Sequence, residues 1–198
     1  MQTDHSIRVN VVTHWIGKIF MRLSRWHVAG TLPPSRKLVV IAAPHTTNWD
    51  FVFLLGAAFV FRLKIHWLGK HKLFTPPFGF IMKWLGGIPV DRSHTTNMVQ
   101  QLKMRFDEAS QLAIVIPPAG TRRSTQYWKS GFYWTAYEAR ATVVCGYLDY
   151  DKKIAGLGLS FIPTGNVKED MDAVREFYEG IEGKYPELAS AIRLKEED

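Results

Sequence analysis

The sequence has a single cysteine, few acidic residues in its first half and no long apolar run. Cys145 alone cannot form an intrachain disulfide or a multi-cysteine metal site, which favours a reducing compartment. The longest uncharged apolar stretch, from Phe51 to Phe61, covers 11 residues, whereas a membrane span needs about 20. The first residues, MQTDHS, are polar and do not resemble a secretory signal. The sequence therefore predicts neither a disulfide-stabilised fold nor a membrane-spanning helix.

Positive charge is concentrated in the first half of the chain. Residues 1–99 contain 12 Lys and Arg against 3 Asp and Glu, while residues 100–198 contain 13 against 15. A basic half-chain predicts an anionic partner, which leaves nucleic acid, anionic lipid and a phosphorylated substrate as candidates. The sequence has no zinc-finger, helix-turn-helix or RNA-binding aromatic motif, so we expect no nucleic-acid partner.

Apolar runs alternate with amphipathic segments along the chain. At 198 residues and 46% apolar content the chain can bury a sizeable core. The runs predict strands at residues 38–43, 64–68, 112–116, 142–148 and 153–161. The amphipathic segments predict helices at residues 48–61, 77–85, 96–110, 129–140 and 170–184. This alternation predicts an α/β fold with a mostly parallel central sheet flanked by helices.

Residues 7–28 predict an additional N-terminal amphipathic helix. Its apolar side carries aromatic and aliphatic residues, among them Trp15, Ile19 and Trp26. We expect the cations Lys18, Arg22 and Arg25 on the opposite side. Such a helix fits the interface of an anionic membrane, and a helix packed on its own domain would show the same pattern. We expect membrane binding, with residues 1–34 as an interface helix and residues 35–198 as the functional domain.

A histidine and an aspartate flank the start of the helix predicted after the first strand. His45 comes two residues after the run Leu38–Ala43, and Asp50 follows five residues later. A carboxylate on one imidazole nitrogen fixes the tautomer and raises the basicity of the other nitrogen, which can then take a proton from a hydroxyl. The same segment also fits an ordinary helix start, with a Thr or Asn cap beside an unrelated histidine.

Two further loops combine glycine with arginine. Gly86–Arg92 offers backbone freedom and a guanidinium suited to phosphate, or forms a plain turn with an Asp–Arg pair. Ile116–Arg123 offers a glycine, a hydroxyl and two guanidinium groups, which suit a phosphate or oxyanion cradle, or an exposed basic turn. Because the carboxyl ends of parallel strands share one edge of a sheet, we expect all three loops to lie close together.

Together the three loops resemble the motifs of the glycerolipid acyltransferases, the family of 1-acyl-glycerol-3-phosphate and lysophospholipid acyltransferases. The first block, H-x-x-x-x-D, is matched by His45 and Asp50. The second block, G-x-I/F-x-I/V-D-R, is matched by Gly87, Ile88, Val90, Asp91 and Arg92. The third block, P-E-G-T-R-S, is matched by Pro118, Gly120, Thr121 and Arg122. The resemblance covers about residues 38–165, and Trp128–Tyr133 (WKSGFY) resembles short bacterial members.

The resemblance implies that residues 35–198 are an acyltransferase domain. It implies a fatty acyl thioester, on coenzyme A or acyl carrier protein, as co-substrate and a lysophospholipid hydroxyl as acceptor. His45 would be the general base and Asp50 its orienting partner. Substrate-binding residues are expected at Asn48, Gly87, Arg92, Gly120, Thr121 and Arg122. The acyl chain would need an apolar slot, for which the candidate lining residues are Phe51, Phe53, Leu54, Phe59 and Trp84, although we expect most of them to pack in the core.

The resemblance also implies where such an enzyme would act and what it would need. A lipid acceptor implies a cytoplasmic protein bound peripherally to the inner face of the cell membrane. The seven His residues show no metal-ligand spacing, so we expect neither a metal nor a resident cofactor.

The third block departs from the family at two positions. Ala119 stands where the family has Glu, and Arg123 replaces the usual Ser. The Ala119 substitution is compatible with an engineered change, a natural variant with another acceptor, or a lost activity. A non-catalytic lipid-binding or acyl-carrier-binding protein and a transferase to a non-phosphorylated aminolipid therefore stay open as alternatives.

Overall fold

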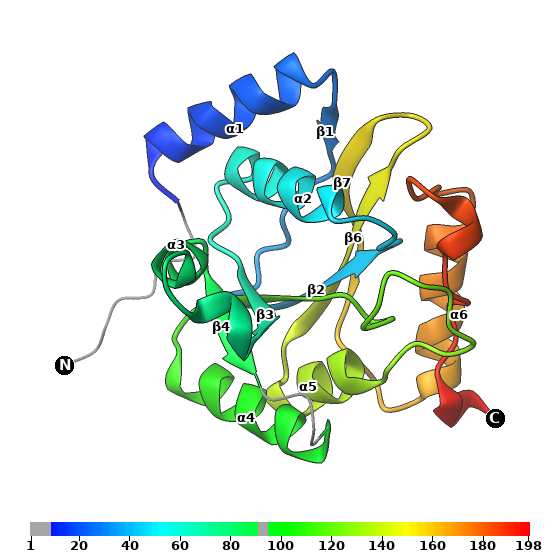
Figure 1. The fold of residues 1–198 in the computed structure, drawn as a ribbon. Coiled ribbons are helices and arrows are strands. Elements are labelled where there is room, and N and C mark those ends of the chain that lie inside the picture. The colour runs from blue at the N-terminus through cyan, green and yellow to red at the C-terminus, as the bar shows by residue number, and fades with distance from the viewer. Residues whose placement is uncertain (1–8, 91–94) are drawn as a thin grey trace.

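A twisted sheet forms the centre of the molecule in the computed structural model, which describes residues 9–90 and 95–198. Within these residues the sheet has seven strands in the order β1-β7-β6-β2-β5-β3-β4 (Figure 1). The strands are β1 (His27–Ala29), β2 (Lys37–Ala43), β3 (His66–Lys70), β4 (Gly87–Val90), β5 (Leu112–Ile116), β6 (Thr142–Asp149) and β7 (Ile154–Phe161). Only the β6–β7 pair is antiparallel among these strands. The predicted mostly parallel α/β fold is confirmed.

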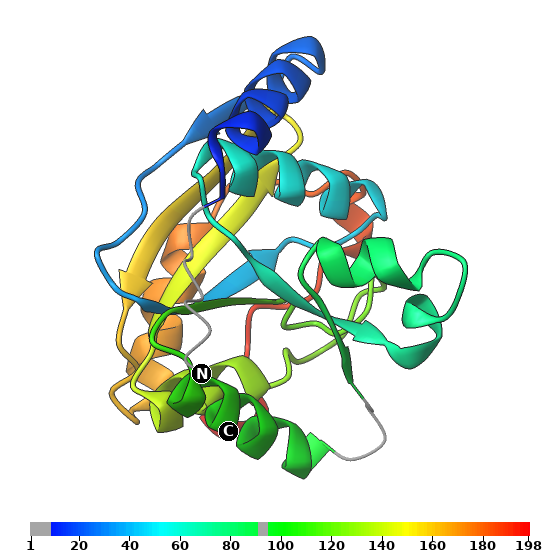
Figure 2. The same ribbon diagram turned by 90° about the vertical axis from the view of Figure 1, so that its left-hand side faces the viewer.

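Helices cover both faces of the sheet. They are α1 (Val11–Leu23), α2 (Trp49–Val60), α3 (Gly79–Trp84), α4 (Thr95–Glu108), α5 (Gly131–Ala139) and α6 (Val167–Tyr178), with short 3₁₀ helices η1 (His71–Phe74), η2 (Pro186–Leu188) and η3 (Lys195–Glu197). Successive strand residues point to opposite faces. Val39 and Ile41 therefore join the core under α4, α5 and α6, while Leu38 and Val40 join the core under α2. Helix α1 lies outside α2 (Figure 2).

The N-terminal helix is shorter than the sequence predicts. Residues 7 and 8 lie outside the described part of the chain, and α1 ends at Leu23 instead of reaching residue 28. Arg25 takes a left-handed conformation with φ of 59°, and the Trp26 N–H donates to the Met21 carbonyl at 2.9 Å. This pattern of bonds closes the helix end. The chain then forms β1, which pairs with β7.

Strand β4 and helix α6 also differ from the expectation. Gly87–Val90 was expected as a loop and forms the edge strand β4, where Pro89 is tolerated because one side of the strand has no partner strand in the sheet. Helix α6 starts at Val167 and ends at Tyr178, earlier at both ends than the predicted helix at 170–184. The side chain of Asn166 accepts from the Glu169 N–H and fixes the earlier start.

The carboxyl edge of the sheet collects two of the three expected loops. Strands β2 and β5 are parallel neighbours, with Ile41 opposite Ile116. The chain leaves both strands at the same edge, so the loop that carries His45 and the loop that carries Gly120 lie side by side. This arrangement follows from the topology alone.

Candidate active site

His45 and Asp50 form a hydrogen-bonded pair at this edge. The loop after β2 carries His45, and Asp50 lies in the first turn of α2. The distance from His45 Nδ1 to Asp50 Oδ2 is 3.0 Å. Asp50 is buried and His45 is part-buried, with 25% of its side chain exposed. With the proton on Nδ1, the neutral ring carries its lone pair on Nε2, the arrangement that a general base requires.

Four hydrogen bonds hold the Asp50 carboxylate. Oδ2 accepts from the backbone N–H groups of Thr46 at 2.8 Å and Thr47 at 3.0 Å as well as from His45. Oδ1 accepts from the Tyr150 hydroxyl at 2.7 Å. Burial raises the pKa of Asp50, but the hydrogen bonds from His45, Thr47 and Tyr150 outweigh it and lower the pKa below its ordinary value. Asp50 is therefore an ionised, fixed partner for the histidine.

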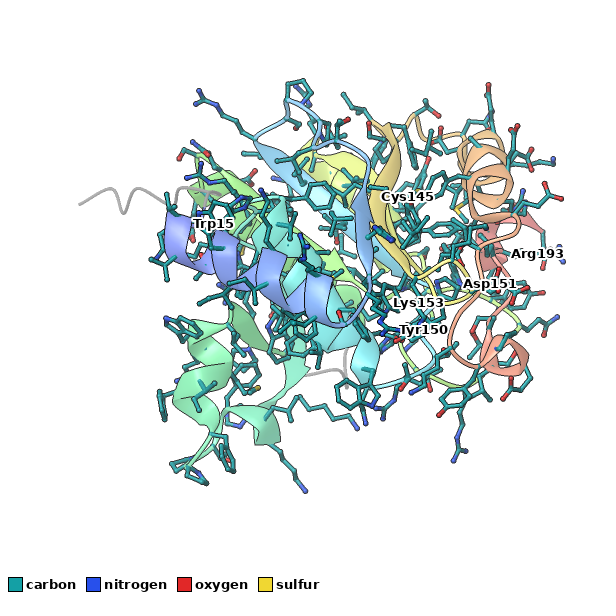
Figure 3. The ribbon with its side chains drawn as sticks, turned by 90° about the horizontal axis from the view of Figure 1, so that it is seen from above. Trp15, Cys145, Tyr150, Asp151, Lys153 and Arg193 are labelled. Atoms are coloured by element: carbon teal, nitrogen blue, oxygen red, sulfur yellow. The ribbon has the colours of Figure 1, made fainter. Side chains whose placement is uncertain are left out.

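Tyr150 is a site residue that the sequence analysis missed. It lies 100 residues from Asp50 in the chain, just after β6, and no motif marks it. Its ring packs edge-on against Trp26 with centroids 4.8 Å apart, and Figure 3 shows Tyr150 beside the C-terminal end of α1. Burial and the bond to Asp50 raise the pKa of Tyr150, so its hydroxyl stays a donor. Tyr150 thus connects the end of α1 to the His–Asp pair.

A mostly apolar cavity of about 740 Å³ starts at this pair and runs between α2 and the sheet. His45, Asn48 and Asp50 line it, as do Phe51 and Leu54 of α2. Further lining comes from Val40, Ala58, Leu63, Ile65, Val115 and Leu157. A cavity of this size and composition can take an acyl chain. Of the other side chains expected along the slot, Phe53 stacks on Trp26 and Trp84 is 71% exposed.

Cationic side chains reach the same cavity from the loop after β5, from the end of β3 and from η1. The loop after β5 contributes Gly120, Thr121 and Arg122, as the sequence predicts. Lys70 and Lys72, at the end of β3 and in η1, line the cavity too and were not expected. Gly120 adopts φ of +67°, and its N–H donates to the Pro117 carbonyl at 3.1 Å, which turns the loop tightly. The arrangement can bind an anionic group in the cavity that His45 also lines.

The second predicted loop contributes less than expected. Asp91 and Arg92 lie outside the described residues, so the binding role of Arg92 stays a prediction. Gly87 does not line the cavity. A Cβ atom there would lie 2.6 Å from Phe74 Cε1 and 2.7 Å from the Met82 carbonyl oxygen. Gly87 is therefore packed under η1 and α3, and its substrate-binding role stays a prediction.

Ala119 lies beside a second, small cavity of about 90 Å³. Trp128, Tyr178 and Ile192 line this cavity, together with His45. The backbone around Ala119 is held by the Lys129 N–H, which donates to the Pro118 carbonyl at 2.9 Å. The loop therefore keeps its position at the strand end without the glutamate that the family motif carries.

Helix α1 presents an apolar face to solvent. Trp15 and Ile19 are 55% and 57% exposed, and Val11, Val12, Ile16 and Leu23 are exposed with them. The inner side, with Gly17 and Met21, packs on α2. Lys18 and Arg22 are exposed, and Lys18 Nζ lies 4.9 Å from the centre of the Trp15 ring. The cations therefore border the apolar face, instead of lying opposite it as expected.

Trp26 is the exception among the predicted membrane residues. It is 7% exposed and stacks on Phe53 with ring centroids 4.2 Å apart. The turn at Arg25 directs Trp26 inward, so it belongs to the core and not to the exposed face. Arg25 itself is exposed beside it. No helix among the described residues is long and apolar enough to cross a membrane.

Comparison with known proteins places this site in a family. The Acyltransferase family matches residues 25–148, which include His45, Asp50 and the loop after β5. The match covers more than half of the chain, so the chain belongs to the Acyltransferase family.

Two curated relatives are 1-acyl-sn-glycerol-3-phosphate acyltransferases. The one from Streptococcus pneumoniae is 26% identical over 106 residues, which are 51% of this chain and 38% of the relative. The one from Pseudomonas aeruginosa is 29% identical over 110 residues, which are 54% of this chain and 41% of the relative. The chain thus matches about two fifths of the length of these relatives.

A solved structure shares the fold. The 1-acyl-sn-glycerophosphate acyltransferase PlsC from Thermotoga maritima superposes with a TM-score of 0.58 at 17% identity. The superposition covers 86% of this chain and 77% of that chain.

Proposed function

We propose that this chain transfers a fatty acyl group from an acyl thioester to the hydroxyl of a lysophospholipid such as 1-acyl-glycerol-3-phosphate. The observation that carries the proposal is the His45–Asp50 pair at one end of an apolar cavity that Arg122, Lys70 and Lys72 also line. One cavity thus offers a base, an acyl slot and an anion-binding wall. The family membership and the named relatives support the same reaction.

The proposed chemistry uses His45 as a proton carrier. Nε2 takes the proton from the acceptor hydroxyl as its oxygen attacks the thioester carbonyl carbon. The tetrahedral intermediate collapses, the carbon–sulfur bond breaks, and the protonated His45 returns the proton to the leaving thiolate. Asp50 keeps Nδ1–H oriented and stabilises the positive imidazolium. Tyr150, Thr46 and Thr47 position Asp50 through the hydrogen bonds described above.

The substrates fit different parts of the cavity. The acyl chain lies between α2 and the sheet, and the acceptor phosphate meets Arg122, with Arg92 as a further predicted ligand. The donor, on coenzyme A or acyl carrier protein, is a co-substrate and not a resident cofactor. Helix α1 binds the anionic inner face of the cell membrane, where a lysophospholipid resides, and the protein is peripheral there. The division into an interface helix at 1–34 and a domain at 35–198 is part of this proposal.

Incubation with isotope-labelled acyl-CoA and a panel of lysolipids, read by mass spectrometry, tests the proposal. We expect a labelled phospholipid from a phosphorylated acceptor in the wild type and none in His45→Ala. A parallel panel of acyl carrier protein thioesters identifies the donor. If product forms only with an aminolipid acceptor, the acceptor is an aminolipid and the proposed lysophospholipid acceptor is wrong.

Ala119 favours a second candidate, a non-catalytic lipid-binding or acyl-carrier-binding protein. The family motif has a carboxylate at this position, and the surroundings here include the apolar side chains of Trp128 and Ile192. Thiol release separates the two candidates: a binding protein retains the labelled thioester without releasing thiol, and His45→Ala leaves that retention unchanged.

A further inference from the structure

Exposed apolar side chains gather on a second surface, formed by η1 and α3 (residues 71–84, the η1–α3 segment). Leu73, Phe78, Phe80 and Trp84 are exposed by 48%, 64%, 72% and 71%. Phe74 is buried and stacks on Trp67 with centroids 5.8 Å apart. The segment is thus anchored from inside by Phe74 while four large apolar side chains face solvent. Such a cluster marks an interaction surface.

The positive charge around this surface favours an anionic partner. Residues 51–90 contain five Lys and Arg and no Asp or Glu. Lys70, Lys72 and Lys83, which flank the apolar side chains in the chain, are exposed. Aromatic side chains bordered by lysines suit the interface of an anionic leaflet, where the rings enter the headgroup region and the ammonium groups meet lipid phosphates.

The η1–α3 segment also forms part of the wall of the catalytic cavity, so membrane binding there would serve the proposed function. Lys70, Lys72, Leu73 and Met82 line the catalytic cavity, so the inner side of the segment is part of the cavity wall. In Figures 1 and 3, α3 lies toward the same left-hand end of the molecule as the N-terminal end of α1, whose apolar face is also exposed. A leaflet that touches both elements would adjoin the cavity wall.

We propose that the η1–α3 segment is a second membrane-binding element, separate from α1, which inserts Phe78, Phe80 and Trp84 into an anionic leaflet beside the cavity. The proposal rests on the proposed function, because it brings the cavity to a lipid acceptor. An acidic protein would also meet the lysines. The four exposed apolar side chains, and the position of α3 toward the same end of the molecule as the N-terminal end of α1, favour the leaflet as the partner.

Site-specific labelling of the full chain tests the proposal. The native Cys145 is fully buried and burial raises its thiol pKa to about 12, so an introduced surface cysteine reacts alone. Phe80→Cys, Ile19→Cys on α1 and Met104→Cys on α4 are labelled with an environment-sensitive nitrobenzoxadiazole dye. Met104 is the matched control, because it is apolar and 60% exposed but lies on α4, at the opposite end of the molecule from α1 in Figure 1.

With phosphatidylglycerol vesicles we expect a blue shift and a severalfold rise in dye emission at positions 80 and 19, and neither at 104. The effect should weaken with phosphatidylcholine vesicles. Phe78→Ser with Phe80→Ser in the unlabelled chain should weaken vesicle binding by about tenfold or more. Met104→Ser with Ile162→Ser serves as the control for lost exposed apolar area.

The proposal is overturned if the dye at position 80 behaves like the dye at 104, whether or not position 19 responds. A response at 80 to acidic acyl carrier protein and none to vesicles would overturn it in favour of a protein partner. Acyl transfer is measured separately. Insertion at 80 in a chain without any transferase activity would refute the proposed function and leave the membrane contact established.

Discussion

At the scale of single residues, the hydrogen bonds to Asp50 are the feature on which the proposed chemistry depends most. Asp50 accepts hydrogen bonds from the backbone N–H groups of Thr46 and Thr47 and from the side chains of His45 and Tyr150. His45, Thr46 and Thr47 lie within five residues of Asp50 and belong to the segment that the sequence motif marks. Tyr150 does not, because it reaches Asp50 only through the folding of β6 beside β2.

Tyr150→Phe should lower kcat by about tenfold and leave the KM of both substrates within about twofold. The variant keeps the ring packing on Trp26 but removes one charge-assisted hydrogen bond, worth about 1.5–3 kcal/mol, from Asp50. Tyr150 does not line the large cavity, so binding should persist. Steady-state kinetics with acyl-CoA measures the split between kcat and KM.

Tyr133→Phe is the matched control for this variant. The Tyr133 hydroxyl donates to buried Asp170 at the same distance, 2.7 Å, but belongs to α5 and the other face of the sheet. It should cost stability and leave kcat unchanged. Equal loss of kcat in both variants would show that Tyr150 acts on stability alone.

Removal of the Tyr150 hydroxyl should also make the fold more sensitive to acid. The pKa of Asp50 lies below its ordinary value in the folded protein, so its ionisation stabilises the fold above about pH 4 and the contribution is lost as the pH falls. Without the Tyr150 donor the folded pKa rises. The midpoint of acid unfolding, followed by circular dichroism, should therefore move to higher pH in Tyr150→Phe. An unchanged midpoint would contradict the assignment.

Ala119→Glu should raise acyl transfer to a phosphorylated acceptor. If the new carboxylate reaches the Arg122 guanidinium, three residues along the same loop, it would accept a charge-assisted hydrogen bond and preorganise the anion-binding loop, which corresponds to about ten- to hundredfold in rate if the bond is realised in the transition state. Initial rates with 1-acyl-glycerol-3-phosphate measure the change. If the variant folds and turnover is unchanged or lost, alanine belongs to this site and the phosphate-binding role should not be assigned to the loop.

At the scale of elements, α1 differs most from what the sequence predicts. The sequence predicts a helix with two sides, one apolar and one cationic. In the structure α1 has three: one side packs against α2, a second is apolar and exposed, and the cations form a border between them. No glycine or proline in the sequence next to Arg25 indicates that the chain turns there. The pattern therefore predicts that the helix exists, and only the packing of Trp26 shows where it ends.

Substitutions in and after α1 should separate membrane binding from folding. Trp15→Ser with Ile19→Ser should weaken binding to phosphatidylglycerol vesicles by about tenfold or more, with little change in melting temperature, because both side chains are exposed. Trp26→Ser should instead destabilise the fold by about 3–5 kcal/mol, because it empties a buried aromatic site. Vesicle sedimentation and thermal unfolding measure the two effects. A strong loss of stability in the exposed pair would favour a packing role for this face.

Among the strands, those with a long apolar run are predicted correctly and the short edge strands are not. The buried runs at residues 38–43 and 112–116 are found as β2 and β5, because strands covered on both faces are apolar throughout. Strand β1 has three residues and β4 has four, one of them a proline, so neither has enough pattern to be recognised. Both lie at the edges of the sheet, where a short or irregular strand is tolerated.

At the scale of the whole molecule, the parallel topology explains why short motifs could predict much of the site. Strands β2 and β5 end at one edge, so two motifs that are about 70 residues apart in the chain share one cavity. The second motif, which carries Gly87, only partly follows, since Gly87 packs beneath η1 instead of entering the cavity. Lys70, Lys72 and Tyr150 depend on how several elements pack together, and no local pattern marks them.

The most direct test of the central claim is the rate of thiol release from acyl-CoA, with and without acceptor, in the wild type, His45→Ala and Asp50→Asn. We expect acceptor-dependent release in the wild type. His45→Ala and Asp50→Asn should each lower kcat by roughly 10³-fold or more, since the base or its correct tautomer is lost. Circular dichroism should show that both variants are folded. Acceptor-dependent release within about tenfold of wild type in folded His45→Ala would contradict the account.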